Sequence, residues 1–204
     1  MNACLVSGRS CLNSHRYLRS ITWYNFLSCS ESRSSSRQNV LKSCPLCATK
    51  LKAIPIGGKV RQACPSCEFV HWDNPKPVTA TLVPLNGGLV LVKRKFEPFI
   101  GNWCLPGGFM EASEHPEQSA AREVFEETGL EIEINRLLGA TTPGRGINVL
   151  ILFYLARQAR GEMKAGDDAS DVAAFRKEEL PENIAFELHR KMIHDFFELM
   201  HKIK

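Results

Sequence analysis

Three glutamates crowd a short stretch in the middle of the chain: Glu123, Glu126 and Glu127. Residues three and four apart on a helix are neighbours on one face, so these carboxylates could share a cation. Mg²⁺ takes a few carboxylate ligands, keeps several waters and completes its shell with substrate phosphates. Upstream, Gly107 and Gly108 allow the backbone to approach a ligand closely. The pattern therefore predicts a metal-assisted attack on a phosphoanhydride, against the alternative of a solvated acidic helix face.

Four of the eight cysteines form two CxxC pairs, Cys44 with Cys47 and Cys64 with Cys67. Two such turns, sixteen residues apart, can close a tetrahedral Cys₄ zinc site. Four thiolates leave no open position for water, so one structural Zn²⁺ is expected. In so short a unit the metal would supply most of the folding energy. The alternative, a pair of redox dithiols, lacks the strand–CxxC–helix context.

Charge divides the chain into a basic leader and a nearly neutral remainder. Residues 1–43 contain six Lys/Arg and one acid, whereas the remainder contains 20 basic and 21 acidic residues, a net charge of −1. A nearly neutral body argues against a nucleic-acid partner. No apolar run reaches the ~20 residues that a bilayer crossing needs, so no membrane partner is expected.

The leader is rich in Ser and Arg and lacks the apolar core of a secretory signal. Its composition is typical of a transit peptide, which predicts an intracellular protein of the chloroplast or mitochondrion. The alternatives are a disordered tail, in an otherwise cytoplasmic protein, or a start codon placed too far upstream. We therefore divide the chain into a leader (1–43), a zinc ribbon (44–72) and a catalytic domain (73–204).

The pattern of apolar residues in the body predicts an α/β (α+β) fold with a mixed sheet and helices on its faces. Strands are expected near residues 78–85, 89–95, 103–105, 137–140, 149–156 and 171–176. The first two of these flank Asn86-Gly87-Gly88, which predicts a hairpin. Helices are expected over 116–128, with Ala120, Val124 and Phe125 facing the core, and over 187–202.

From Gly108 to Leu130 the sequence follows the pattern Gly-x5-Glu-x7-Arg-Glu-Val-x-Glu-Glu-x-Gly-Leu. This segment resembles the complete Nudix box, the signature of hydrolases that cleave nucleoside diphosphates linked to another group. The resemblance implies the Nudix fold, a mixed sheet between helices. It also implies one to three Mg²⁺ or Mn²⁺ ions, coordinated by the Gly107 carbonyl and the carboxylates of Glu123, Glu126 and Glu127. Such cations would neutralise the pyrophosphate and activate the attacking water.

The same resemblance implies supporting roles for other residues. Arg122 is expected to pair with an acid, for which Glu114 is the candidate, and so to fix the Gly108 loop rather than touch substrate. A general base is also needed. By its distance from the box, Asp168 matches a further ligand or base of the zinc-ribbon subgroup of Nudix proteins. That subgroup often has glutamate there, so an acidic surface turn remains the alternative.

Residues 44 to about 195 resemble this zinc-ribbon subgroup, some members of which hydrolyse NADH, ADP-ribose or FAD. NADH-preferring members carry Ser-Gln-Pro-Trp-Pro-Phe-Pro after the box, whereas this chain has Thr-Thr-Pro-Gly-Arg-Gly-Ile-Asn over 141–148. The difference favours ADP-ribose or FAD. Phe99 could stack on an adenine or flavin. Arg94 and Arg145 could contact phosphate, or could be solvated arginines.

The sequence thus predicts a pyrophosphohydrolase that acts on a small nucleotide and gives AMP plus a second phosphorylated product. One alternative is a pyrophosphatase for NADH or for NAD-capped RNA ends. An alternative from another class is a non-catalytic regulator in which the ribbon binds nucleic acid and the box senses a nucleotide. The intact glutamates argue against the latter. Many relatives are dimers, so the resemblance leaves a homodimer open.

Overall fold

The computed structural model describes residues 41–144, 146–166 and 168–202. Almost all of the predicted leader lies outside these residues, as does Arg145, one of the two expected phosphate contacts. Within the described part, neither helix combines the length and the apolar character that crossing a bilayer requires.

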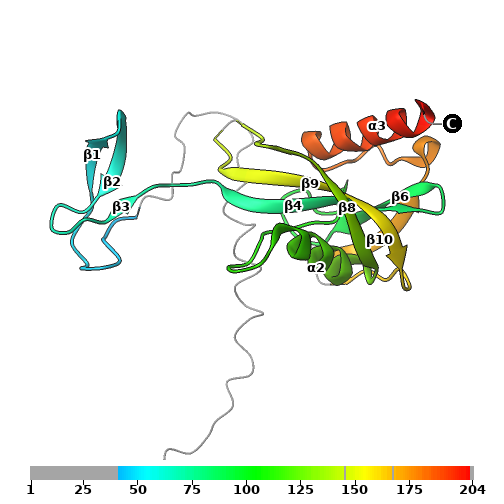
Figure 1. Cartoon of the computed structure of the whole chain (residues 1–204), viewed down its shortest axis with the longest axis horizontal. Coiled ribbons are helices and arrows are strands. Elements are labelled where there is room, and N and C mark those ends of the chain that lie inside the picture. The colour runs from blue at the N-terminus through cyan, green and yellow to red at the C-terminus, as the bar shows by residue number, and fades with distance from the viewer. Residues whose placement is uncertain (1–40, 145, 167, 203–204) are drawn as a thin grey trace, which may run out of the picture.

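The cysteine-rich segment forms a small antiparallel sheet at one end of the molecule (Figure 1). Its first two strands, β1 (Lys52–Ile56) and β2 (Lys59–Ala63), pair as a hairpin, and β3 (Val70–His71) adds to β2. Gly57 and Gly58 make the turn with φ of 58° and 76°, a left-handed conformation that glycine adopts without a steric penalty. An extended segment then leads from β3 to the body.

The body contains two sheets. The strands of the first are, in spatial order, β4 (Lys76–Leu82), β9 (Val149–Arg160) and β8 (Glu131–Thr141). The central strand β9 runs parallel to β4 and antiparallel to β8, so the sheet is mixed. The second sheet has the order β10 (Ala169–Phe175), β6 (Gly88–Arg94) and β5 (Pro84–Leu85), with the short β7 (Trp103–Cys104) also paired to β6.

Two helices, α2 (Pro116–Thr128) and α3 (Glu187–Lys202), lie on opposite sides of the sheets (Figure 1). A short 3₁₀ turn, η1 (Lys177–Glu179), precedes α3. Strand β6 is buried on both faces, and its side chains alternate between the two cores. Leu89 and Leu91 pack in the cluster that includes α3, whereas Val90 packs with Val124 of α2. Alternation with a period of two is what a strand covered on both faces requires.

The expected mixed α+β architecture is confirmed, and both helices have the predicted bounds. Two details differ. The predicted hairpin at 86–88 is formed by β5 and β6 alone, because β4 ends at Leu82 and pairs with β9 in the other sheet. Phe125 does not face the core and is 54% exposed, because it lies about 100° around the helix from the buried Val124.

Candidate active site and zinc site

The glycine loop lies against the edge of β4. The backbone N–H of Thr81 donates to the Pro106 carbonyl at 2.9 Å, and that of Thr79 donates to the Gly108 carbonyl at 2.9 Å. At Gly107 a Cβ would stand 2.0 Å from the Thr79 carbonyl oxygen, so only glycine fits. At Gly108 a Cβ would lie 2.5 Å from the Glu123 carboxylate. The glycines therefore let the loop pack between β4 and the acidic helix.

Helix α2 begins and ends at defined signals. Pro116 occupies the first turn, and the Gln118 side chain accepts a hydrogen bond from the backbone N–H of His115. At the other end Gly129 adopts a left-handed φ of 73°, and its N–H donates to the Phe125 carbonyl. The fully buried Ala120 and Val124 fix the rotation of the helix. That rotation places the box carboxylates beside the glycine loop.

Arg122 joins the acids of the loop and the helix. Its guanidinium binds Glu114 in a bidentate pair, with Nε to Oε1 at 2.7 Å and Nη2 to Oε2 at 2.9 Å. Its Nη1 donates to Glu123 at 2.7 Å and to Glu126 at 2.9 Å, and Nη2 donates to the Phe109 carbonyl at 3.2 Å. Hydrogen bonding from Arg122 lowers the pKa of Glu114 to about 2. The expected Arg122–Glu114 pair is thus present, and Arg122 also keeps Glu123 and Glu126 together.

Glu127 lies on the inner side of the cluster. Its Oε2 accepts a hydrogen bond from the backbone N–H of Gly107 at 2.9 Å. Burial raises the pKa of Glu127 well above its usual value, and the nearby negative charges of Glu123 and Asp168 raise it further. Three carboxylates that disfavour one another's charge form a suitable environment for a divalent cation. The donor set therefore fits Mg²⁺ or Mn²⁺, which take oxygen ligands and keep waters.

Asp168 reaches this cluster through a segment that runs along the C-terminal end of α2. Lys164 donates its backbone N–H to the Thr128 carbonyl at 2.8 Å, and Gly166 donates to the Glu127 carbonyl at 3.2 Å. A Cβ on Gly166 would lie 2.6 Å from the Glu126 carbonyl oxygen. The two hydrogen bonds from Lys164 and Gly166 satisfy carbonyls in the last turn of α2 that lack a partner within the helix. Sequence reasoning missed this segment; a glycine within a polar loop was the available signal of a close backbone approach.

The two described residues expected to contact substrate differ in their surroundings. Arg94 is 9% exposed, and its Nε donates to the Pro98 carbonyl at 2.6 Å. Its guanidinium also lies over the Phe186 ring, 5.1 Å from the centroid. Arg94 therefore anchors the loop between β6 and β7, and its expected contact with substrate phosphate stays a prediction. Phe99, at the tip of that loop, is 43% exposed and has a positive φ of 66°.

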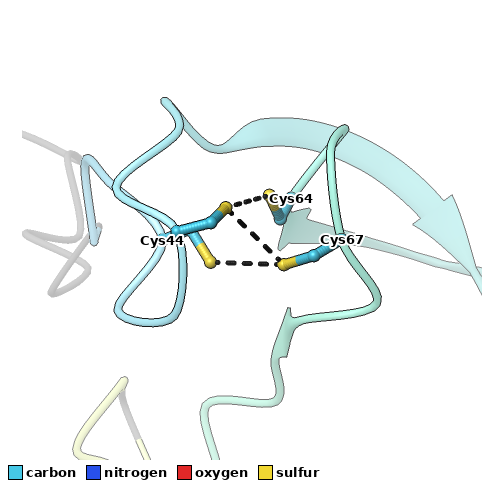
Figure 2. Close-up of side chains that lie close together, drawn as sticks. Cys44, Cys64 and Cys67 are labelled. Carbon is cyan, nitrogen blue, oxygen red and sulfur yellow. Dashed lines mark hydrogen bonds between the residues drawn. The ribbon is translucent and has the colours of Figure 1, made fainter.

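The four cysteines of the ribbon converge on one point. Figure 2 shows the sulfur atoms of Cys44, Cys64 and Cys67 turned toward one another. The Sγ atoms of Cys44 and Cys67 are 3.5 Å apart, as are those of Cys47 and Cys64. Tetrahedral zinc with Zn–S bonds of about 2.3 Å needs S–S edges of about 3.8 Å, and a disulfide would need about 2 Å. The distances fit a zinc site and exclude disulfides.

Backbone N–H groups support these sulfurs. Leu46 donates to the Cys44 sulfur and Ser66 to the Cys64 sulfur, each at 3.4 Å. Hydrogen bonding with Thr49 lowers the pKa of the Cys47 thiol to about 6, whereas burial and the neighbouring cysteines raise the pKa of Cys67 to about 12, so Cys47 ionises first in the metal-free site. In the described part of the chain, this is the one set of three or more ligand atoms that lie within 4.8 Å of one another.

Comparison with known proteins gives an independent result for the body. The family model of the NUDIX domain matches residues 75–196. An ADP-ribose pyrophosphatase of Methanocaldococcus jannaschii is 38% identical over 118 residues, which cover 56% of this chain and 69% of that protein.

Solved structures agree with that result. A NUDIX hydrolase from Nitrosomonas europaea superposes with a TM-score of 0.72 at 29% identity, covering 79% of this chain and 93% of the other. A bifunctional NMN adenylyltransferase/ADP ribose pyrophosphatase from Francisella tularensis, complexed with AMP and a Mn ion, has a TM-score of 0.50 at 26% identity. It covers 61% of this chain and 41% of the other.

Proposed function

Because the chain belongs to the Nudix family of hydrolases, which act on pyrophosphate bonds, we propose that it hydrolyses the diphosphate bridge of ADP-ribose or FAD. The products would be AMP and ribose 5-phosphate or FMN. The observation that carries this proposal is the convergence of Glu123, Glu126, Glu127 and Asp168 beside the glycine loop. The name and sequence identity of the archaeal ADP-ribose pyrophosphatase support the choice of substrate.

We assign the metal-holding role to the Gly107 carbonyl and to the carboxylates of Glu123, Glu126 and Glu127. Mg²⁺ or Mn²⁺ bound there supplies Lewis-acid activation of the phosphates and of the attacking water. Arg122 holds two of these carboxylates at 2.7 and 2.9 Å, which limits the rearrangement needed on binding. The Gly107 N–H orients the third. Pre-arranged ligands lower the cost of organising the site.

Asp168 is the proposed proton acceptor for the attacking water. Its backbone is fixed, because its carbonyl accepts a hydrogen bond from the Lys95 N–H at 2.9 Å. Its side chain is half-buried and close enough to Glu127 to raise the pKa of that residue. A carboxylate held beside the cluster, and partly open to solvent, can take a proton during attack and pass it on to water.

Phe99 is the proposed contact for the aromatic ring of the nucleotide. It packs edge-on against Phe186, with ring centroids 5.6 Å apart, and remains partly exposed. Residues in sparsely populated backbone conformations persist where the surrounding structure imposes them, and they cluster at ligand sites. Trp103, in contrast, is 9% exposed and belongs to the core.

The test is a substrate panel with the purified full chain: ADP-ribose, FAD, NADH and diadenosine polyphosphates, each with Mg²⁺ or Mn²⁺. Products are identified by chromatography, and hydrolysis in ¹⁸O-water shows which phosphorus is attacked. We expect turnover of ADP-ribose or FAD to AMP, with NADH slower. Preference for NADH would favour the alternative dinucleotide substrate. Hydrolysis of none of the panel would refute the proposed function.

Two variants connect the activity to the site. Asp168→Asn should lower kcat by about 10²–10⁴-fold, the usual effect of removing a general base. Glu117→Gln is the control, because Glu117 is an exposed acid on the first turn of α2, outside the carboxylate cluster. Equal loss in both variants would contradict the assignment of Asp168.

A further inference from the structure

Leu105 occupies the junction between β7 and the glycine loop, and a side chain of α3 holds its backbone. The N–H of Leu105 donates to Nδ1 of His189 at 3.2 Å. Both residues are buried, at 1% and 8% exposure. The bond joins residues 84 positions apart, so it ties the C-terminal helix to the strand that enters the active site.

The Leu105 N–H needs a side-chain acceptor because the backbone pairing beside β7 ends before it reaches this residue. Residues 183–185 run beside β7, where Trp103 donates to the Asn183 carbonyl at 2.9 Å and Ala185 donates to the Trp103 carbonyl at 2.8 Å. The next residue of this strand with its N–H on the same side is Leu105. By that point the neighbouring chain has turned into α3, which begins at Glu187. The imidazole nitrogen replaces the missing carbonyl.

The imidazole is fixed in one chemical state. Because Nδ1 accepts a hydrogen bond, the proton of the neutral ring is on Nε2. Burial lowers the pKa of His189 to about 3, and the positive charge of Arg94 acts in the same direction. The ring also packs against Phe153 and Phe186, with centroid separations of 5.7 and 5.0 Å. At neutral pH the Nδ1 atom is therefore free of a proton and can accept the hydrogen bond from Leu105.

Four hydrogen bonds hold the loop on alternating sides. Leu105 is bound by His189, the Pro106 and Gly108 carbonyls are bound by β4, and the Gly107 N–H is bound by Glu127. The bond from His189 is the first of these along the chain. It determines where the loop leaves β7, two residues before Gly107.

We propose that His189 is a positioning residue of the active site, which places the Gly107 carbonyl and the Gly107 N–H through its bond to Leu105. This inference rests on the proposed function, because the Gly107 carbonyl matters as a ligand of Mg²⁺ or Mn²⁺. His189 itself does not touch the substrate or the metal. Its effect reaches the site through the backbone, because Leu105 lies two residues before Gly107.

The experiment compares two replacements in the full chain. His189→Asn keeps an acceptor oxygen at the same number of bonds from Cα as Nδ1, whereas His189→Leu removes the acceptor. His194→Leu is the control, because His194 is exposed on the same helix. Three properties are measured: hydrogen exchange of the Leu105 and Gly107 amides in metal-free protein, the Mn²⁺ dissociation constant by calorimetry, and kcat.

We expect His189→Leu to exchange these two amides at least about tenfold faster and to bind Mn²⁺ about 10–100-fold more weakly, as is usual when a supporting partner of a ligand is removed. His189→Asn should recover most of both losses. Unchanged exchange and Mn²⁺ affinity in His189→Leu would overturn the proposal. Equal losses in the two variants, with a matching fall in Tm, would assign His189 to core packing instead.

The parent protein gives a test that does not depend on the variants folding. Long-range ¹⁵N spectra should show neutral His189 with its proton on Nε2 and a coupling from the Leu105 amide to Nδ1. A proton on Nδ1 would overturn the proposal. A parent that binds no Mn²⁺ and hydrolyses nothing would instead refute the proposed function, while amide exchange and the ¹⁵N spectra would still report on the bond.

Discussion

The ribbon and the body each gather four side chains that can bind a cation, but the surrounding structure supports the two sets in opposite ways. In the ribbon, Cys44 and Cys64 themselves form the buried cluster, together with Leu51. The body has an extensive apolar core that includes Phe153, Leu89 and Leu91, and its carboxylates lie at the border of that core. In the ribbon the metal ligands themselves make up the buried cluster, whereas the body has an apolar core that does not include its metal ligands.

The supporting charges differ in the same way. In the described part of the chain the cysteine sulfurs accept hydrogen bonds from backbone N–H groups, so a zinc ion bound there would have to balance most of the charge of the thiolates. In the body, the Arg122 guanidinium already pairs with Glu114, Glu123 and Glu126. We infer that the ribbon depends on its metal to fold, and that the body folds first and takes its metal as part of the reaction.

The largest expected effect concerns the ribbon. Cys64→Ser should abolish stoichiometric zinc and unfold residues 44–72, because structural zinc contributes about 10–16 kcal/mol in small zinc modules. Elemental analysis and amide hydrogen exchange would measure this, and the protection of the body should persist. Cys104→Ser is the control, because Cys104 is buried in a different cluster. An equal zinc content per chain in Cys64→Ser and in the parent would contradict the inference that the ribbon, unlike the body, depends on its metal to fold.

The second prediction separates activity from stability in the body. Glu127→Gln should lower kcat by about 10²–10³-fold, as expected for removing one pre-arranged electrostatic group. The fold should survive. Burial raises the pKa of Glu127 in the folded state, so ionisation of Glu127 destabilises the metal-free protein above the usual value of 4.5.

The sign of the pH dependence follows from that shift. Without added Mg²⁺ or Mn²⁺, Glu127→Gln should be more stable than the parent at pH 7–8, and the difference should close as the pH falls toward 4.5. Denaturant titrations at several pH values would measure it. A variant that is less stable than the parent at neutral pH would show that the body, like the ribbon, needs this ligand to fold.

The third prediction concerns the Arg122 pair. Glu114→Gln should lower the free energy of unfolding by about 1.5–3 kcal/mol at pH 7, the range for hydrogen bonds to charged groups. The pKa of Glu114 is lowered from 4.5 to about 2, so this contribution is present above pH 4.5 and is lost as the pH falls toward 2. Glu133→Gln is the control, since its pair with Arg157 is exposed and screened by solvent, so the free energy of unfolding should change much less.

The smallest expected effect tests the segment that carries Asp168. Gly166→Ala would place a Cβ 2.6 Å from the Glu126 carbonyl oxygen, so the segment must shift, at a cost of about 1–3 kcal/mol. The kcat should fall while KM changes little. Gly139→Ala is the matched control, because a Cβ there meets nothing within 4 Å. Equal activity in the two variants would mean that Asp168 needs no such support.

The sequence was sufficient for elements whose pattern is local. Pro116 and Gly129 are local signals, so both ends of α2 could be predicted, and the Arg122–Glu114 pair was expected from the resemblance of this one motif to the Nudix box. The convergence of four cysteines also follows from local turns. In each case a short-range rule carries enough information, because the contacts form within about twenty residues of sequence.

Contacts between distant segments could not be predicted in this way. Arg94 resembles a surface arginine in sequence, and only the loop that folds over it makes it buried. The pairing of β4 with β9 rather than with β6 depends on residues about seventy positions away. His189 resembles any polar residue on an amphipathic helix, and its acceptor role depends on where the neighbouring ladder ends.

The parallel pairing of β4 with β9 also sets an order of events during synthesis. Val78 aligns with Ile151, so β4 gains its neighbour only after about seventy further residues have been made. Chains are made at about 5–20 residues per second. We therefore expect the ribbon to leave the ribosome and load zinc several seconds before the hydrolytic centre exists.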